Sequence, residues 1–237
     1  MNRVGRGPRD VREVRIRTGV QRDPAGSVEV TFGQTVVIVA ATVGASVPPW
    51  LQGKSQGWVT AEYAMLPGAT PERQGRVQKG RSEEIQRLVG RSLRAAVDLK
   101  ALGERLVTVD CDVLQADGGT RCASITGGWV ALAMACRRLM DRGLLAASPI
   151  RHQVCALSAA IVDGEVLVDP DYSEDHRAQA DLNFVMTADG RLVEVQGTAE
   201  GDPFPEDLLR VALARVREAL PGVLEAQRRA LQEGRFP

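Results

Sequence analysis

The residues with the clearest chemical potential stand where a strand-like run meets a long apolar stretch. The sequence there reads Asp117-Gly118-Gly119-Thr120-Arg121. Glycines let the backbone approach a ligand closely, and the free N–H groups of a helix start favour an anion. Thr120 adds a hydroxyl and Arg121 adds a forked cation. Taken alone, the pattern is either an anion site or an ordinary strand-to-helix turn in which Thr120 caps the helix.

A second group of candidates lies in a basic segment further upstream. Residues 67–80 show no apolar period and contain proline and glycine, so we expect a flexible loop there. Four basic residues fall within nine positions of this region: Arg73, Arg76, Lys79 and Arg81. A basic loop beside a helix start is typical of a protein that binds a polyanion, particularly a single-stranded one. Arg94 follows on the predicted helix, on a face that it shares with Arg87 and Arg91 and that is ordinarily solvated.

Two carboxylates form a third group. Asp175 lies in an acidic segment, and Asp181 comes where an apolar strand is expected to begin. Carboxylates at a strand entrance can hold Mg²⁺ or act as a general acid. Spacing alone does not distinguish a metal-binding or catalytic role from that of ordinary solvent-exposed carboxylates, because surface loops are commonly acidic. His152 and His176 show no partner pattern, and we assign them no role.

Charge is distributed unevenly along the chain, although the formal net charge is zero. Residues 1–105 contain 17 Lys and Arg against 10 Asp and Glu, whereas residues 156–207 contain 13 acids against two arginines. Only three of the 30 basic residues are lysines, and the planar fork of arginine suits bidentate phosphate recognition. A GC-rich genome or a heat-adapted surface would also raise total arginine, but neither accounts for the clustering.

Composition indicates an ordinary globular protein, with 44% hydrophobic and 25% charged residues in 237. No apolar run approaches the ~20 residues of a membrane span, so we expect no membrane association. The four cysteines stand in apolar runs without a C-x-x-C pair, which is typical of free core thiols in a reducing compartment. We therefore expect a cytoplasmic location.

The elements that must position these candidates alternate along the chain. We predict strands over residues 11–20, 25–46 (a hairpin turning at Gly33), 56–66, 107–115, 153–162, 165–169 and 181–196 (a second hairpin), with helices over 82–103, 120–140 and 205–233. Ser82 is the expected cap of the first helix. This order predicts an α+β fold of the split βαβ type, with helices covering mixed sheets. No linker interrupts the middle of the chain, so we expect one domain over residues 1–237.

Four long blocks of sequence together resemble a known family. They are SQGWVTAEYAML from Ser55, GRSEEIQRLVGRSLRAAVDLKALGE from Gly80, DCDVLQADGGTRCASITGG from Asp110 and VEVQGTAEG from Val193. In this order they closely resemble bacterial ribonuclease PH, over nearly the whole chain. The resemblance implies an enzyme that removes nucleotides from RNA 3′ ends, such as those of tRNA precursors, with inorganic phosphate as co-substrate and nucleoside 5′-diphosphates as products.

The resemblance also implies site residues and an assembly. The family's phosphate ligands correspond to Arg81 and to Gly119, Thr120 and Arg121. Its two acidic residues correspond to Asp175 and Asp181, which would serve as catalytic groups or as ligands of the expected Mg²⁺. Arg73 and Arg76 correspond to loop arginines that contact RNA in the family, and we also expect an RNA contact at Arg94. The family forms a hexameric ring, a trimer of dimers, and the same is expected here.

Some positions depart from the family pattern. The loop over residues 67–81 is shorter than usual, Gly68 stands where an arginine is expected, and His176 replaces a small residue. Two other functions remain open at this point. One is a catalytically silent RNA-binding ring subunit, although such proteins tend to lose the phosphate arginines or the acidic pair, and this chain keeps both. The other is an anion-binding protein that acts without RNA.

Overall fold

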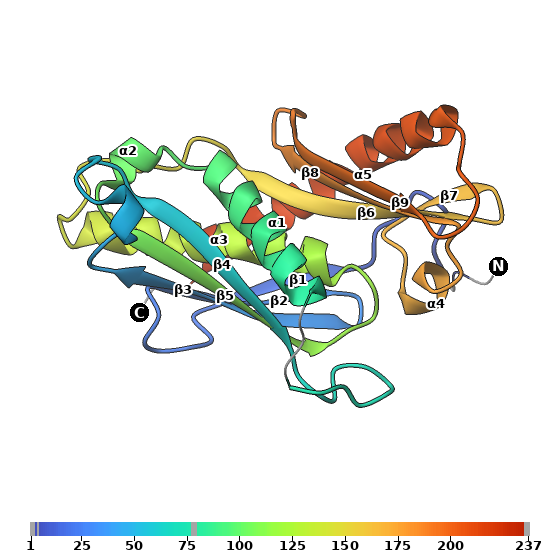
Figure 1. The fold of residues 1–237 in the computed structure, drawn as a ribbon, viewed down its shortest axis with the longest axis horizontal. Coiled ribbons are helices and arrows are strands. Elements are labelled where there is room, and N and C mark those ends of the chain that lie inside the picture. Colours follow the sequence, from blue (N-terminus) through green and yellow to red (C-terminus); the bar gives the residue numbers. More distant parts are fainter. Residues whose placement is uncertain (1–2, 4, 77–79, 235–237) are drawn as a thin grey trace.

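Two antiparallel-rich β-sheets form the frame of the protein in the computed structural model, which describes residues 3, 5–76 and 80–234 (Figure 1). Lys79 lies outside the described residues. The first sheet has the strand order β1-β2-β3-β5-β4, with the bounds β1 Val14–Thr18, β2 Gly26–Phe32, β3 Thr35–Gly44, β4 Trp58–Met65 and β5 Leu106–Gln115. The second sheet has the order β7-β6-β8-β9, with β6 Val154–Val162, β7 Glu165–Val168, β8 Ala180–Thr187 and β9 Leu192–Ala199.

One parallel pair distinguishes the first sheet. Strands β4 and β5 run parallel, and the helix α1 (Arg81–Ala95) lies in the connection between them. A parallel pair needs such a crossover, so β4, α1 and β5 form a β–α–β unit. Along β5 the residues Val107, Val109, Cys111 and Val113 are buried while their neighbours are more exposed, which is the period-2 alternation that the sequence predicts.

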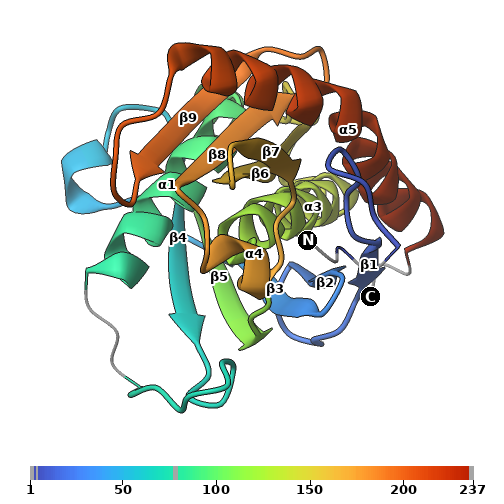
Figure 2. The same ribbon diagram turned by 90° about the vertical axis from the view of Figure 1, so that its right-hand side faces the viewer.

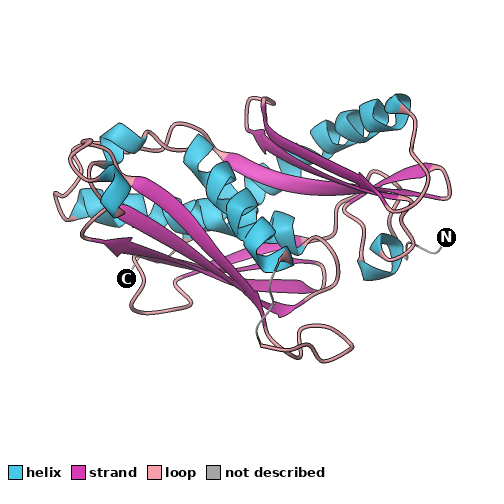
Figure 3. Cartoon of the chain, in the orientation of Figure 1, coloured by secondary structure: helices cyan, strands magenta, loops and turns pink. Residues whose placement is uncertain are grey.

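Two helices fill the space between the sheets (Figure 2). The long helix α3 (Thr120–Asp141) packs on β2 and β3 of the first sheet and on β6 of the second, while α1 packs on β4 and touches β9. The last helix, α5 (Glu206–Glu233), packs along β6 and β7 and also reaches β1. Figure 3 shows this alternation of helices and sheets. Both sheets therefore share one apolar core, in which Val30, Val109, Ile125 and Phe184 are fully or almost fully buried.

The predicted helix over residues 82–103 is two helices. Helix α1 ends at Ala95, Val97 forms a bridge with Ile150, and the short helix α2 (Leu99–Leu102) follows. Asp98 separates them, because its carboxylate accepts from the backbone N–H groups of Lys100 and Ala101 at 3.0 and 3.2 Å. Asp98 thus caps a new helix start instead of continuing α1.

The cap predicted at Ser82 is also wrong. Helix α1 begins at Arg81, after Gly80 with φ 76°, and no side chain caps it within the described residues. Ser82 is buried inside the first turn. Two short elements were not predicted: a 3₁₀ turn over Pro49–Leu51, and the one-turn helix α4 (Tyr172–Asp175) in the acidic segment.

The α+β prediction is confirmed, and the remaining strands and helices lie where the sequence places them to within a few residues. The single domain over 1–237 stays a prediction. Within the described residues, no helix combines the length and hydrophobicity that a bilayer crossing requires.

Candidate active site

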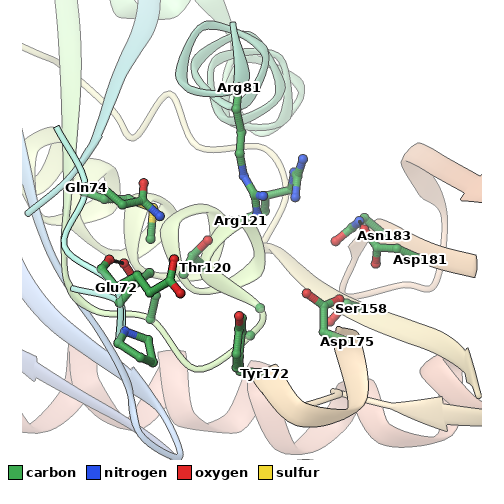
Figure 4. Close-up of a pocket in the computed structure, with 16 residues that line it drawn as sticks. Glu72, Gln74, Arg81, Thr120, Arg121, Ser158, Tyr172, Asp175, Asp181 and Asn183 are labelled. Atoms are coloured by element: carbon green, nitrogen blue, oxygen red, sulfur yellow. Dashed lines mark hydrogen bonds between the residues drawn. The ribbon is translucent and has the colours of Figure 1, made fainter. Parts of the chain in front are cut away.

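A pocket of about 330 Å³ lies at the start of α3, and residues of both sheets, Met65 of β4 and Ser158 and Asp181 of β6 and β8, help to line it (Figure 4). It contains all six residues predicted to bind phosphate or to act as acids: Arg81, Gly119, Thr120, Arg121, Asp175 and Asp181. These residues come from α1, the start of α3, α4 and β8. In Figure 4 the arginine side chains converge from one side, and the two aspartates face them from the other.

The Gly118-Gly119 turn presents a free helix start to this pocket. Both glycines have positive φ, at 76° and 70°, and Gly119 is the N-cap of α3 in the left-handed conformation. A Cβ at Gly118 would lie 2.5 Å from the carbonyl oxygen of Pro170, so the position excludes any side chain. No side chain caps α3 among the described residues, which leaves the first N–H groups of the helix for an anion.

Thr120 is the first residue of α3, and Gly119 is the N-cap. Thr120 therefore does not occupy the capping position that an ordinary strand-to-helix turn would give it. Its hydroxyl oxygen accepts a hydrogen bond from the Tyr63 hydroxyl at 2.9 Å. Tyr63 lies on β4 and is buried, and this burial raises the pKa of its phenol. The contact therefore joins the start of α3 to the first sheet and fixes the Thr120 side chain beside the pocket.

The two arginines occupy different environments. Arg81 is the first residue of α1 and is exposed. The Arg121 side chain is only 20% exposed and donates to the Glu84 carboxylate at 2.9 Å. Its buried Nε atom has no hydrogen-bond partner in the described chain. An unpaired buried donor on a cation leaves a position for an anionic oxygen, which is what a phosphate would supply.

The two aspartates are partly buried, and their pKa values reflect it. Burial raises the pKa of Asp175, and the neighbouring charge of Asp181 raises it further. Burial also raises the pKa of Asp181, although Arg121 and a 3.0 Å hydrogen bond from Asn183 oppose the rise. A carboxyl group with a raised pKa keeps its proton at a higher pH than usual, so it can act as a general acid.

The raised pKa of Asp175 predicts that Asp175→Asn stabilises the protein. A carboxyl whose pKa is higher in the folded than in the unfolded state contributes stability below its unfolded pKa and loses it as the pH rises through the folded pKa. Asparagine has no such loss. In phosphate-free buffer we expect a higher Tm for Asp175→Asn than for the wild type near pH ~8 and a shrinking difference toward pH ~4.

Asp189→Asn is the matched control for that calorimetric series. Hydrogen bonding from Thr187 and the charge of Arg191 lower the pKa of Asp189, so its substitution should give no gain near pH ~8. Equal Tm values for wild type and Asp175→Asn across the series would contradict the prediction.

Several further polar residues of the pocket were not predicted, among them Ser158, Tyr172 and Asn183. Asn183 stands two residues after Asp181 on β8, so both side chains share one face of the strand. The sequence Asp181-Leu182-Asn183 in an expected strand could have indicated that Asn183 lies beside Asp181. Ser158 is the single hydroxyl residue of the otherwise apolar β6, and a lone polar residue in a buried strand is a comparable signal.

The predicted RNA contacts lie outside the pocket. Arg73 and Arg76 are exposed on the segment after β4, next to the pocket residues Glu72 and Gln74. Arg94 is farther along α1, where it donates to the carbonyl oxygen of Val59 at 2.8 Å and lies 4.4 Å over the Trp58 ring. Its role in RNA binding stays a prediction, and its observed contacts are those of a packing residue.

No group of three or more acidic, histidine or cysteine side chains that could enclose a metal ion occurs among the described residues. The pocket offers the carboxylates of Asp175 and Asp181. Mg²⁺ is often held by one or two carboxylates together with substrate phosphates, with water completing its octahedron. The donor set fits a metal ion shared with the substrate, and it does not fit one enclosed by protein ligands alone.

This combination defines a class of protein. Fixed cations and a free helix start face protonatable carboxylates across one pocket, which is the arrangement of an enzyme that acts on a phosphate ester. Sequence models of the 3′ exoribonuclease family match the chain in succession, domain 1 over residues 10–138 and domain 2 over residues 152–215. The chain therefore belongs to the 3′ exoribonuclease family.

Individual relatives agree with this assignment. The chain is 50% identical over 233 residues to ribonuclease PH of Maricaulis maris (strain MCS10), covering 96% of this chain and 98% of that protein. Rice (Oryza sativa) Rrp46 has a similar structure, with a TM-score of 0.80 at 18% identity over 96% of this chain and 98% of that one. The Archaeoglobus fulgidus exosome with RNA bound to the active site gives a TM-score of 0.77 at 24% identity, over 97% and 91%. At these identities the two structures establish the fold alone.

Proposed function

We infer that this chain is a phosphate-dependent 3′→5′ exoribonuclease. The observation that carries the inference is the pocket itself, in which Arg81, Arg121 and the free start of α3 face Asp175 and Asp181. Full-length similarity to a ribonuclease PH supports the same activity. The substrates are an RNA 3′ end and inorganic phosphate, and the products are a nucleoside 5′-diphosphate and an RNA one nucleotide shorter.

The reaction brings two anions together, and the arginines make this possible. A phosphate oxygen attacks the phosphorus of the last internucleotide linkage, a new P–O–P bond forms, and the bond from phosphorus to the ribose 3′-oxygen breaks. We propose that Arg81, Arg121 and the N–H groups at Gly119 and Thr120 hold the attacking phosphate. Preorganised donors of this kind act without reorganisation during the reaction, which is why each contributes strongly to the rate.

The departing 3′-oxygen needs a proton, and we propose that Asp181 donates it. The raised pKa of Asp181 keeps the proton available, and the hydrogen bond from Asn183 orients the carboxyl group. The partly buried Asp175 lines the same pocket, and the charge of Asp181 contributes to its raised pKa, so we propose that Asp175 supports Asp181. In the alternative role, Asp175 and Asp181 would be deprotonated and would hold Mg²⁺, and the ion instead of the proton would then stabilise the departing 3′-oxygen.

Phosphate dependence tests the proposed function. Purified protein is incubated with a short 3′-tailed RNA and Mg²⁺, with and without inorganic phosphate, and the released nucleotides are separated. Phosphate-dependent release of nucleoside diphosphates supports phosphorolysis. Release of monophosphates without phosphate would mean hydrolysis and would overturn the inference, and RNA binding without any release would favour the silent subunit.

The exposed arginines of the loop should contribute to RNA binding through charge. Each phosphate contact that is lost reduces the steepness with which RNA affinity falls with salt. We expect the double variant Arg73→Ala/Arg76→Ala to bind single-stranded RNA more weakly and to lower the slope of log K against log[salt] by about 1–2. Fluorescence anisotropy over a salt series measures this, with Arg142→Ala, a solvent-exposed arginine beyond α3, as the control. An unchanged slope would contradict the assignment.

Substrate, assembly and location complete the proposal. We propose that the RNA substrates include tRNA 3′ ends and that the chain assembles into a hexameric ring, a trimer of dimers, as the resemblance to ribonuclease PH implies. A sedimentation mass near that of one chain would contradict the ring. A cytoplasmic location is supported by the four cysteines, which are all buried and unpaired.

A further inference from the structure

The buried Arg12, distant in sequence from the pocket residues, contacts the Asp117-Gly118-Gly119 turn, here called the phosphate-binding turn, on the side that faces away from the pocket. Arg12 precedes β1 and is 7% exposed. Its Nε and Nη2 atoms donate to the two carboxylate oxygens of Asp169 at 2.9 and 2.7 Å, and its backbone N–H donates to the same carboxylate at 2.8 Å. Asp169 is 1% exposed. A two-pronged pair of this kind fixes the direction of both side chains as well as their distance.

The other edge of the Arg12 guanidinium holds the turn. Its Nη1 atom donates to the carbonyl oxygen of Asp117, and its Nη2 atom donates to that of Gly118 at 3.3 Å. Thr35, the first residue of β3, completes the cluster: its hydroxyl donates to the Gly118 carbonyl at 2.6 Å and accepts from the Asp117 N–H at 2.9 Å. The carbonyl groups just before Gly119 are therefore held in a buried polar cluster while the following helix start faces the pocket.

Asp169 extends this cluster to the acidic side of the pocket. It has φ 49° and directly precedes Pro170 and Asp171, the residues against which Gly118 packs. Asp171 then caps α4, accepting from the N–H groups of Ser173 and Glu174. Helix α4 ends at Asp175. Arg12 thus contacts both the turn before Gly119 and Asp169, the residue from which the chain leads through α4 to Asp175.

A stabilising role alone accounts poorly for this arrangement. Desolvation of a buried ion pair offsets most of its Coulomb attraction, so such a pair is weak support for stability but can specify a unique geometry. Here the geometry that it specifies is the separation between Gly119 and Asp175. We propose that Arg12 and Asp169 are positioning residues that set the phosphate-binding turn relative to the acidic pair. The proposal rests on the phosphorolytic function proposed above.

Two conservative variants test it. Arg12→Lys keeps the charge but loses the fork, and Thr35→Val keeps the shape of the side chain but loses both hydrogen bonds to the turn. We expect each to raise the KM for phosphate or lower kcat by about tenfold to a hundredfold, because small misplacements of reacting groups cost rates of that order. The KM for RNA should stay within twofold. If Arg12→Lys does not fold, Thr35→Val alone tests the proposal.

A second measurement needs no turnover. Inorganic phosphate should raise the Tm of the wild type by binding to the folded state, and the two variants should require at least tenfold more phosphate for the same rise. Arg9→Ala is the control, since Arg9 is exposed in the same segment and pairs with Glu218 on α5; it should match the wild type in both measurements.

The outcomes separate the two levels of inference. If the wild type shows neither phosphate-dependent release nor a phosphate-induced rise in Tm, the proposed function fails. If the wild type shows both, and the variants have a lower Tm but an unchanged phosphate dependence and kcat, Arg12 and Asp169 are merely structural and the positioning proposal is overturned.

Discussion

Asp181→Asn should reduce phosphorolysis more than any other single substitution in the pocket, lowering kcat by about 10²–10⁴-fold. Asparagine is nearly isosteric with aspartate and its carbonyl can still accept the hydrogen bond that Asn183 gives to Asp181. The fold and the pocket should therefore persist while the proton donor is lost. The KM for phosphate should change little, since Arg81 and Arg121 remain.

Single-turnover assays with a 3′-labelled RNA measure this effect without interference from product release. Asp163→Asn is the matched control, because Asp163 lies in the turn between β6 and β7, has φ 51°, and is largely exposed. Asparagine tolerates that backbone conformation. A kcat of Asp181→Asn within a few-fold of the wild type would remove Asp181 from its proposed role as the acid.

Arg81→Ala and Arg121→Ala should act instead on phosphate. A hydrogen bond to a charged group contributes roughly 1.5–3 kcal/mol, so Arg81→Ala should raise the phosphate concentration needed for half-maximal rate by about tenfold or more. Arg121→Ala should be more damaging, because Arg121 is less exposed and its loss leaves Glu84 without its partner beside the incoming anion.

Initial rates at varied phosphate and fixed RNA separate these effects. Arg81→Lys should recover part of the loss, since the charge returns without the fork. Arg87→Ala should behave as the wild type, because Arg87 is exposed on the same helix but does not line the pocket. An unchanged phosphate requirement in Arg81→Ala would contradict its assignment as a phosphate ligand.

The sequence predicted most elements because their signals are local. Alternation identified β5, and the glycine pair marked the junction with α3. The break at Asp98 was missed because the apolar period of α1 runs past it. The one-turn helix α4 was also missed, although Asp171 and Glu174 form a capping box whose spacing is legible in the sequence.

Some site residues could be predicted from the sequence and others could not. Read by themselves, the Gly118-Gly119 turn and the two aspartates were ambiguous, and only the resemblance of several blocks to one family joined them. Arg12 and Asp169 escaped both kinds of reasoning. They are 157 positions apart, and Arg12 stands in a run of alternating basic residues whose other arginines are more exposed. Arg12 is the buried one because the segment after β7, which carries Asp169, and the Asp117-Gly118 turn both pack against it in the folded chain.

The division of the pocket between the two halves of the chain has a consequence for biosynthesis. The arginines and the helix start all precede residue 122, whereas the acids are at positions 175 and 181. A chain that ends before the second sheet therefore lacks both acids, although it carries both arginines. Because Asp181 reaches the pocket only when β8 pairs between β6 and β9, a partly translated chain carries the proposed phosphate ligands without the proposed acids.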